Sequence, residues 1–251
     1  MEFSRDYLVH YYEADATQCL SLPALVQYFE DIAILHSSAQ GLDLEYYHRN
    51  NCGWMLLKWD ITIERMPLFG QTVTVTTRVH SMKGFLADRE FRMTSADGTH
   101  LASARSNWLL VDTVRRRPLR VPAEQYEKFG VSPADERSFV SIEETLPPAG
   151  DGELDGECKT FPVKTVYSDI DTNGHVNNVR YITWAIDSLP ESFSRLHTPV
   201  SIRVQYKKEL AAGMNADLRT SLSPLGTESR HGVFDGKDLC AAIDIRWNER
   251  T

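Results

Sequence analysis

The sequence has no long hydrophobic run. Nowhere does it approach the roughly 20 consecutive apolar residues that a membrane-spanning helix needs. Its first residues, MEFSRDYLVHYYEAD, carry charge from the second position and lack the apolar stretch of a secretory signal. We therefore expect neither a membrane span nor a signal peptide.

Cysteine is scarce, and the familiar nucleotide and metal motifs do not occur. The four cysteines lie far apart and form no C-x-x-C pair, so a zinc site is not expected. Reduced thiols in a cytoplasmic protein are the simpler interpretation. The sequence also contains no G-x-S-x-G, G-K-[ST] or H-E-x-x-H. We expect neither a metal nor an organic cofactor.

Positive charge is in the minority. The chain has 27 Lys and Arg against 35 Asp and Glu, which gives a net charge of −8. Nucleic-acid-binding proteins usually present a basic surface, so nucleic acid is not expected as a partner. One dense basic run interrupts this pattern, VRRRPLRVP, and its simplest interpretation is a solvated loop. Its arginines are Arg115, Arg116, Arg117 and Arg120.

A turn rich in Asp, Asn and Gly precedes an amphipathic helix within residues 168–187, SDIDTNGHVNNVRYITWAID. Free main-chain N–H groups and a partial positive charge at a helix start favour negative charge. An enzyme can use such a position to hold a developing oxyanion. Of the eight histidines in the sequence, only His175 has this setting. We therefore take this segment as the candidate site.

The same pattern occurs in weaker form near the N-terminus, at HYYEADATQCLSLPALVQYFED. Placing Asp15 on Asp171 gives an offset of 156 positions, which also brings the two expected helices into register. The first copy has Cys19 where the second has His175. We expect a structural role for the first copy and chemistry only in the second.

Helical spacing of apolar residues predicts a helix at about 23–36 and another at about 178–189. Ser21 is a suitable cap for the first helix, and Pro190 should stop the second. Segments with the alternating pattern of β-strands follow each helix, and each set contains an Asp-Gly hairpin signal, at 97–98 and 235–236.

One strand, one long helix and about four antiparallel strands, occurring twice, predict an α+β fold of two tandem units. Each unit should be an antiparallel sheet wrapped around one long central helix. We expect the N-terminal unit at 1–125 and the C-terminal unit, with the catalytic residues, at 161–251. The segment 126–160 is rich in Pro, Gly and acidic residues and is predicted to be a linker.

Two such units, with D-x-N-x-H-V-N-N before the second helix, resemble the acyl-ACP thioesterases, the plant and bacterial hydrolases of fatty acyl carrier protein. The resemblance covers most of the chain and is sharpest in NGHVNNVRYITWAID (173–187) and VQYKKEL (204–210). It implies two hot-dog units in one chain. It also implies a catalytic group, which by position is Asp171, Asn173, His175 and Glu209.

The sequence departs from the family directly after Glu209, where many members carry a cysteine and this chain has Leu210. Leucine has no ionisable group, so the site has no thiol nucleophile there. We expect water activated by Glu209 or His175 to attack instead. Asn173 and main-chain N–H groups near the helix start should polarise the thioester carbonyl. Asp171 could orient Asn173 or His175, or act as the base itself.

Each of these residues also has a plain structural interpretation. Residues 171–174 alone form a turn sequence, and Glu209, which follows two lysines, could be a surface glutamate. Asn177 and Asn178 fit helix caps better than catalysts. Tyr181 fits the core better than a substrate contact.

The function implied by the resemblance is thioester hydrolysis that releases a free fatty acid from acyl-acyl carrier protein. An acyl-CoA thioesterase of the same fold and a non-catalytic acyl-binding hot-dog protein are the alternatives. The basic run at 115–120 could dock an acidic carrier protein or the phosphate of its pantetheine arm. A double unit already forms an internal pseudo-dimer, so a monomer is feasible, but two chains could also form a homodimer.

Overall fold

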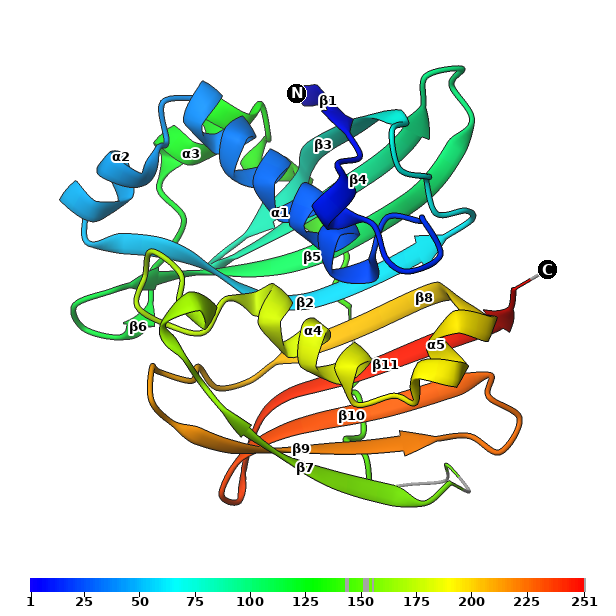
Figure 1. The fold of residues 1–251 in the computed structure, drawn as a ribbon. Coiled ribbons are helices and arrows are strands. Elements are labelled where there is room, and N and C mark those ends of the chain that lie inside the picture. Colours follow the sequence, from blue (N-terminus) through cyan, green and yellow to red (C-terminus); the bar gives the residue numbers. More distant parts are fainter. Residues whose placement is uncertain (143–144, 151–153, 155, 251) are drawn as a thin grey trace. The chain divides into compact units, whose positions relative to one another are not determined.

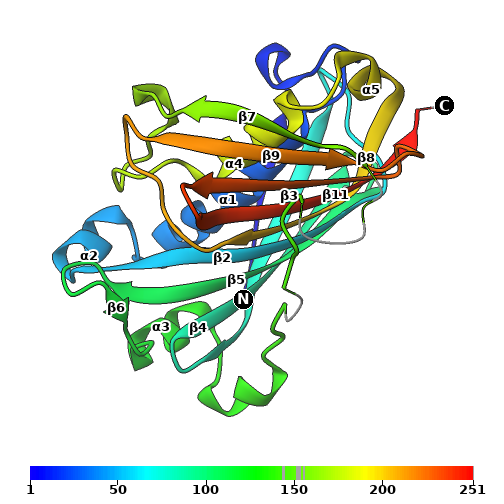
Figure 2. The ribbon, with the colours of Figure 1, turned by 90° about the horizontal axis from the view of Figure 1, so that it is seen from below.

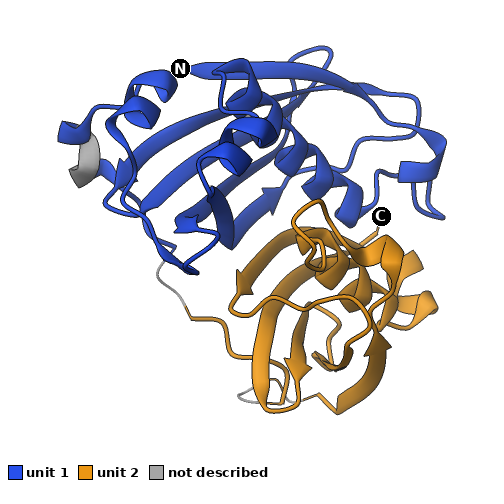
Figure 3. Ribbon diagram, turned by 90° about the vertical axis from the view of Figure 1, so that its left-hand side faces the viewer, with its two compact units in different colours: residues 1–143 blue, residues 144–251 orange. Residues whose placement is uncertain are grey.

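The computed structural model describes residues 1–142, 145–150, 154 and 156–250. The chain divides into two units, residues 1–143 and 144–251 (Figure 3). The border between them lies inside the segment 126–160 that the sequence predicted as a linker. Among the described residues, no helix is both long and apolar enough to cross a membrane.

The first unit carries one antiparallel sheet in the order β1-β3-β4-β5-β2, with the short β6 paired to β5 (Figure 1). Its strands are β1 (Glu2–Leu8), β2 (Cys52–Ile63), β3 (Thr72–Lys83), β4 (Leu86–Ser95), β5 (His100–Asp112) and β6 (Arg117–Pro118). Along β2, Trp59, Ile61 and Ile63 are buried whereas Asp60 and Thr62 are exposed. One face of the sheet therefore carries the core.

Helix α1 (Leu22–Ala39) lies against this buried face (Figure 1). It begins after Ser21, whose side chain accepts a hydrogen bond from a main-chain N–H of the first turn. Its buried side includes Phe29, whose ring meets those of Trp59 and Phe91 at centroid distances of 6.1 and 5.3 Å. The predicted helix at 23–36 is confirmed and is somewhat longer at both ends.

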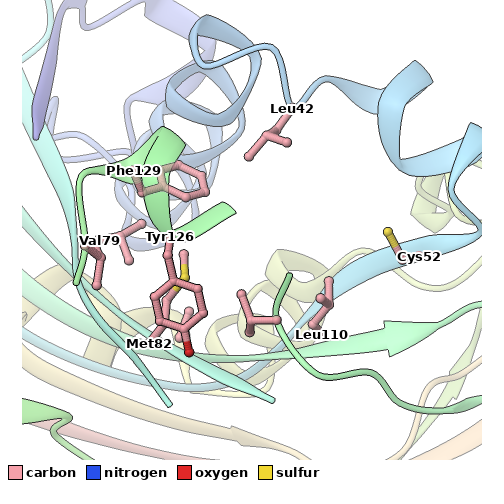
Figure 4. Packing of buried hydrophobic residues seen from close by; sticks show 10 residues of the cluster. Leu42, Cys52, Val79, Met82, Leu110, Tyr126 and Phe129 are labelled. Atoms are coloured by element: carbon pink, nitrogen blue, oxygen red, sulfur yellow. The ribbon is translucent and has the colours of Figure 1, made fainter. Parts of the chain in front are cut away.

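Two shorter helices, α2 (Leu44–Arg49) and α3 (Ala123–Phe129), pack around a further buried cluster of the first unit (Figure 4). The cluster consists of Leu42, Cys52, Val79, Met82, Ala87, Leu110, Val121, Tyr126, Phe129 and Val131. Residues 126–131 therefore belong to a folded core, although the sequence placed them in a linker. They do so because apolar side chains on α3 and just after it are buried, and the Pro- and acid-rich stretch begins only beyond them.

The second unit repeats this topology with a sheet in the order β7-β9-β10-β11-β8 (Figure 2). Its strands are β7 (Cys158–Lys164), β8 (His197–Tyr206), β9 (Asn215–Leu222), β10 (Glu228–Asp235) and β11 (Asp238–Glu249). In each unit the first strand forms one end of the order and the second strand forms the other. The predicted α+β fold of two tandem hot-dog units is confirmed.

The helix of the second unit comes in two pieces. Helix α4 (Asn178–Asp187) begins after Asn177, whose side chain accepts a hydrogen bond from the main-chain N–H of Val179 at 2.9 Å. It packs against β9 and β11. Pro190 then precedes α5 (Glu191–Leu196), which confirms the expected stop. The cap at Asn177 places the preceding turn, residues 171–175, directly before the start of α4.

Candidate active site

The turn before α4 is organised by one carboxylate. Oδ1 of Asp171 accepts hydrogen bonds from the main-chain N–H groups of Asn173, at 2.8 Å, and His175, at 3.3 Å. Its Oδ2 accepts from the side-chain amide of Asn173 at 3.4 Å. Gly174 has a φ of +83°, a conformation that glycine adopts without steric cost. Asp171 therefore fixes the main chain of both neighbours and the amide of one.

An imidazole and a carboxylate meet beside this turn. Nε2 of His175 lies 3.3 Å from Oε2 of Glu209, and the two side chains are 31% and 37% exposed. Both groups thus reach solvent while they contact each other, a suitable arrangement for proton transfer to or from water. Within the part of the chain that the structure describes, no group of three or more His, Cys, Asp and Glu could hold a metal ion.

The segment that carries Glu209 is fastened to α4 and to the turn before it. The main-chain N–H of Val176 donates to the carbonyl of Leu210 at 2.8 Å. The N–H of Leu210 in turn donates to the hydroxyl of Tyr181 at 3.2 Å. Tyr181 is buried, and burial raises the pKa of its hydroxyl, which therefore stays protonated. These bonds hold Glu209 beside His175, and sequence reasoning had placed Tyr181 only in the core.

The main-chain donors of the turn are already engaged. Each N–H from Asn173 to Asn177 donates within the second unit, and the acceptors in chain order are Asp171 Oδ1, Asp171 O, Asp171 Oδ1, Leu210 O and Asp169 O. This geometry differs from the expectation that such N–H groups would hold an oxyanion. The side-chain amide of Asn173 has a second N–H, because only one of its two hydrogens can point at Asp171.

An ion pair between a buried carboxylate and a partly exposed arginine anchors the turn. Asp169 is 2% exposed, and its Oδ1 accepts from Nε of Arg180 on α4 at 2.7 Å. The same residue accepts hydrogen bonds from the main-chain N–H groups of Val166 and Asn177. Sequence reasoning missed this anchor. The repeat contained a signal for it, because the offset of 156 places Asp169 on Glu13, another acidic residue.

The first unit has the same turn without the same side chains. Asp15 accepts hydrogen bonds from the main-chain N–H groups of Thr17, at 2.8 Å, and Cys19, at 3.3 Å. The β-bridge that follows each turn places the buried Met66 where the second unit has Glu209. The structure therefore brings the four predicted catalytic residues together in the second unit, and their counterparts in the first unit include no imidazole and no second carboxylate.

The basic run lies in the first unit, at the turn between β5 and β6 and just after it. All four of its arginines are exposed, Arg115, Arg116, Arg117 and Arg120. Asp112 organises this turn, because its carboxylate accepts from two main-chain N–H groups and lies 3.6 Å from the Arg115 guanidinium. These hydrogen bonds lower the pKa of Asp112. The run is thus a structured surface turn rather than an irregular loop.

Curated proteins that are similar to this chain include acyl-carrier-protein thioesterases. A palmitoyl-acyl carrier protein thioesterase from Gossypium hirsutum is 26% identical over 241 residues, which cover 92% of this chain and 57% of that protein. A dodecanoyl-[acyl-carrier-protein] hydrolase from Umbellularia californica is 23% identical over 240 residues, 92% of this chain and 62% of that protein. The chain spans little more than half the length of these curated relatives.

Solved structures agree on the fold. A crystal structure from Lactobacillus plantarum, provisionally named oleoyl thioesterase, has a TM-score of 0.89 at 27% identity and covers 100% of this chain and 97% of that one. A 12:0-ACP thioesterase from Umbellularia californica has a TM-score of 0.82 at 21% identity, with 99% and 98% covered. The family model for the acyl-ACP thioesterase N-terminal domain matches residues 1–129, and the C-terminal model matches 153–249. Because these two models take in most of the sequence, the chain belongs to the acyl-ACP thioesterase family.

Proposed function

We propose that this chain hydrolyses the thioester that joins a fatty acyl chain to acyl carrier protein. The observation that carries the proposal is the 3.3 Å approach of His175 to Glu209 beside the turn organised by Asp171. Membership of the family supports it, as do the relatives named as acyl-carrier-protein hydrolases.

The reaction follows from the groups at hand. A water molecule held by the His175–Glu209 pair attacks the carbonyl carbon, and one member of the pair accepts its proton. The amide of Asn173, oriented by Asp171, donates to the carbonyl oxygen as negative charge builds there. The carbon–sulfur bond then breaks, and the pair returns the proton to the departing sulfur. The products are a fatty acid and the free thiol of the carrier.

Conservative variants test the pair and identify its base. Glu209→Gln removes the carboxylate and keeps the shape, and His175→Gln removes the imidazole. We expect each to lower kcat on acyl-ACP about 10²–10⁴-fold, the usual contribution of a general base. The variant that lacks the base should also lose the acidic limb of the pH profile of kcat. Full turnover by both variants, with unchanged circular dichroism, would refute the site.

Variants of the basic run test whether its arginines bind the carrier protein. An acidic carrier protein would meet the exposed arginines at 115–117, and this attraction would weaken as salt increases. Replacing the three by Ala should raise KM for acyl-ACP and leave hydrolysis of acyl-CoA unchanged. A variant with Ala at the exposed Arg65, Arg92 and Arg246 removes the same number of charges elsewhere and is the matched control. Equal use of both substrates by the wild-type protein would favour the acyl-CoA thioesterase.

Two further parts of the proposal concern the cellular location and the oligomeric state. The cytoplasmic location stays a prediction, and the plant relatives named above are chloroplastic proteins. The homodimer also stays a prediction. Sedimentation velocity at several protein concentrations distinguishes it from a monomer of two fused units.

A further inference from the structure

The segment that carries Glu209 is tied to the hairpin between β10 and β11 by the lysine that precedes it. Asp235 is the last residue of β10, and Asp238 is the first residue of β11. Nζ of Lys208 lies 2.9 Å from Oδ2 of Asp235 and 2.5 Å from Oδ2 of Asp238. Hydrogen bonds to Asp238 and Asp235 raise the pKa of Lys208 above its usual range, so the ammonium group stays charged. One cation therefore joins both ends of the hairpin to the segment.

Main-chain hydrogen bonds hold this segment on both sides of Glu209. Before it, the N–H groups of residues 207 and 208 both donate to the carbonyl of Cys240 on β11, at 2.8 and 3.2 Å. After it, the N–H of Leu210 donates to the hydroxyl of Tyr181 on α4. Glu209 is thus the single residue between an anchor on β11 and an anchor on α4. The place of its carboxylate beside the imidazole of the site depends on both anchors.

The first unit has the main-chain part of this arrangement without the ion pairs. There the N–H groups of residues 64 and 65 both donate to the carbonyl of Leu101 on β5, at 2.9 and 3.1 Å. Arg65 occupies the place of Lys208, and Met66 follows it where the second unit has its carboxylate. Arg65 forms no ion pair with any residue that the structure describes. The first sheet thus forms without a paired cation at this place, and the paired one belongs to the unit that carries the candidate base.

We propose that Lys208 is a positioning residue, which holds the carboxylate of Glu209 against the imidazole of His175. The inference deepens the proposed function and rests on it. Two carboxylates of the hairpin engage the ammonium group, so Lys208 acts through its segment and not on the substrate. A displacement of about 1 Å can lower a rate about 10²-fold, whereas an ion pair of a side chain that is 42% exposed adds little to folding stability. Loss of these ion pairs should therefore lower turnover more than stability.

Substitutions on both sides of the ion pairs test this role. Lys208→Met removes the charge, and we expect kcat on acyl-ACP to fall about 10- to 100-fold while KM stays within about twofold. Lys208→Arg can still pair with both carboxylates and should recover most of the turnover. Replacing Asp235 and Asp238 together by Asn should lower kcat as much as Lys208→Met does. Lys237→Met, at an exposed position of the same hairpin, is the control and should resemble wild type. Full kcat in Lys208→Met or in the double Asn variant overturns the inference alone.

A double-mutant cycle shows whether Lys208 acts through Glu209. In a protein that already carries Glu209→Gln, Lys208→Met should change the residual kcat by less than about twofold, because the group that it positions is gone. A further loss of about 10-fold would show that Lys208 contributes independently, and it would overturn the inference while the hydrolase proposal stands.

Nuclear Overhauser contacts test the geometry without any substrate. They should join the side chains of His175 and Glu209 in the wild-type protein and in Lys208→Arg, and they should be lost in Lys208→Met. Contacts that persist in Lys208→Met overturn the inference. This measurement does not depend on turnover, so absence of acyl-ACP hydrolysis by the wild-type protein would refute the proposed function separately.

Discussion

The turns that precede α1 and α4 have the same hydrogen bonds and different chemistry. In both, an aspartate accepts the N–H two residues on at 2.8 Å and the N–H four residues on at 3.3 Å. Gly174 takes a φ of +83° in the second turn, and Gln18 takes +64° at the same place in the first. A residue with a side chain rarely adopts this region. The shape of the turn therefore depends on Asp15 and Asp171 and does not require glycine.

The side chains around the two turns decide what each can do. His175 and Glu209 in the second unit correspond to Cys19 and Met66 in the first. At these two positions the first unit has a thiol and a thioether, and neither is an imidazole or a carboxylate that would take a proton from water at neutral pH. The turn is therefore kept in both units by the same main-chain hydrogen bonds, and the two units differ in the side chains that they place around it.

The largest difference between the two units should appear in kcat/KM when corresponding residues of the two turns are substituted. His175→Ala should lower kcat/KM on acyl-ACP about 10²–10⁴-fold, because the proton acceptor or its orienting partner is lost. Cys19→Ala at the corresponding position should leave kcat/KM within about twofold of wild type, since it removes no general base. Thiol release from acyl-ACP measures both. A comparable loss in the two variants would show that the first turn also takes part in the reaction.

Acid should affect both units through one buried histidine in each. Burial lowers the pKa of His36 to about 4 and that of His231 to about 3, against 6.5 for the unfolded chain. Their contribution to stability is present above pH 6.5 and is lost as the pH falls, because only the unfolded chain then binds the proton. For His36 the difference of 2.5 units (6.5 − 4) corresponds to about 3 kcal/mol.

Urea unfolding between pH 7 and 4, together with NMR titration of the imidazole signals, checks this expectation. His36→Gln should flatten the pH dependence of the free energy of unfolding. An imidazole signal of His36 or His231 that titrates near pH 6.5 in the folded protein would contradict it.

The interactions of the two acidic residues that precede the turns, Asp169 and Glu13, should contribute less to stability than the buried histidines. Arg180→Ala leaves the buried carboxylate of Asp169 without its cation, and we expect a loss of roughly 2 kcal/mol, since the arginine itself is partly exposed. At the matching acid of the first unit, Tyr28 donates to Glu13 at 2.7 Å. Tyr28→Phe removes a single hydrogen bond and should cost about 1 kcal/mol. Urea denaturation compares the two, and a larger loss for the tyrosine variant would reverse the ranking.

The mildest comparison concerns the aspartates themselves. Asp15→Ala and Asp171→Ala each remove the acceptor for two main-chain N–H groups near the surface, and each should cost about 1 kcal/mol. Only the change at 171 should also lower kcat, because it frees the Asn173 amide. Thermal unfolding and turnover, measured on the same preparations, separate the two effects. Equal loss of activity in both variants would argue for a structural role alone.

The sequence was sufficient for the features that depend on local pattern. Helix starts at Ser21 and Asn177 could be read because a cap requires only its own side chain and the next turn. The hairpins at 97–98 and 235–236 followed from Asp-Gly pairs, and they connect β4 to β5 and β10 to β11. The constant offset of 156 positions then linked the two halves into one repeated topology.

Features that depend on contacts between distant segments could not be predicted from the sequence. The main-chain N–H of Val176 donates to the carbonyl of Leu210, which lies more than thirty residues away in the sequence. Nothing in the residues next to Val176 indicates that this N–H is unavailable to a substrate. Arg89 is buried, but the sequence does not distinguish it from the other charged residues of β4. Arg89 pairs with Val79 on β3, next to a register shift between Val79 and Ser81. Its guanidinium also lies over the ring of Phe129, which comes from α3.

Gln18 has a practical consequence for protein engineering. The first unit already holds its turn in the conformation of the turn before α4, and it does so with no glycine at the position of positive φ. New chemistry at Thr17, Cys19 and Met66 would thus be a matter of exchanging side chains on a finished scaffold. The turn at Asp15 is therefore a preformed backbone at which a catalytic centre could be engineered.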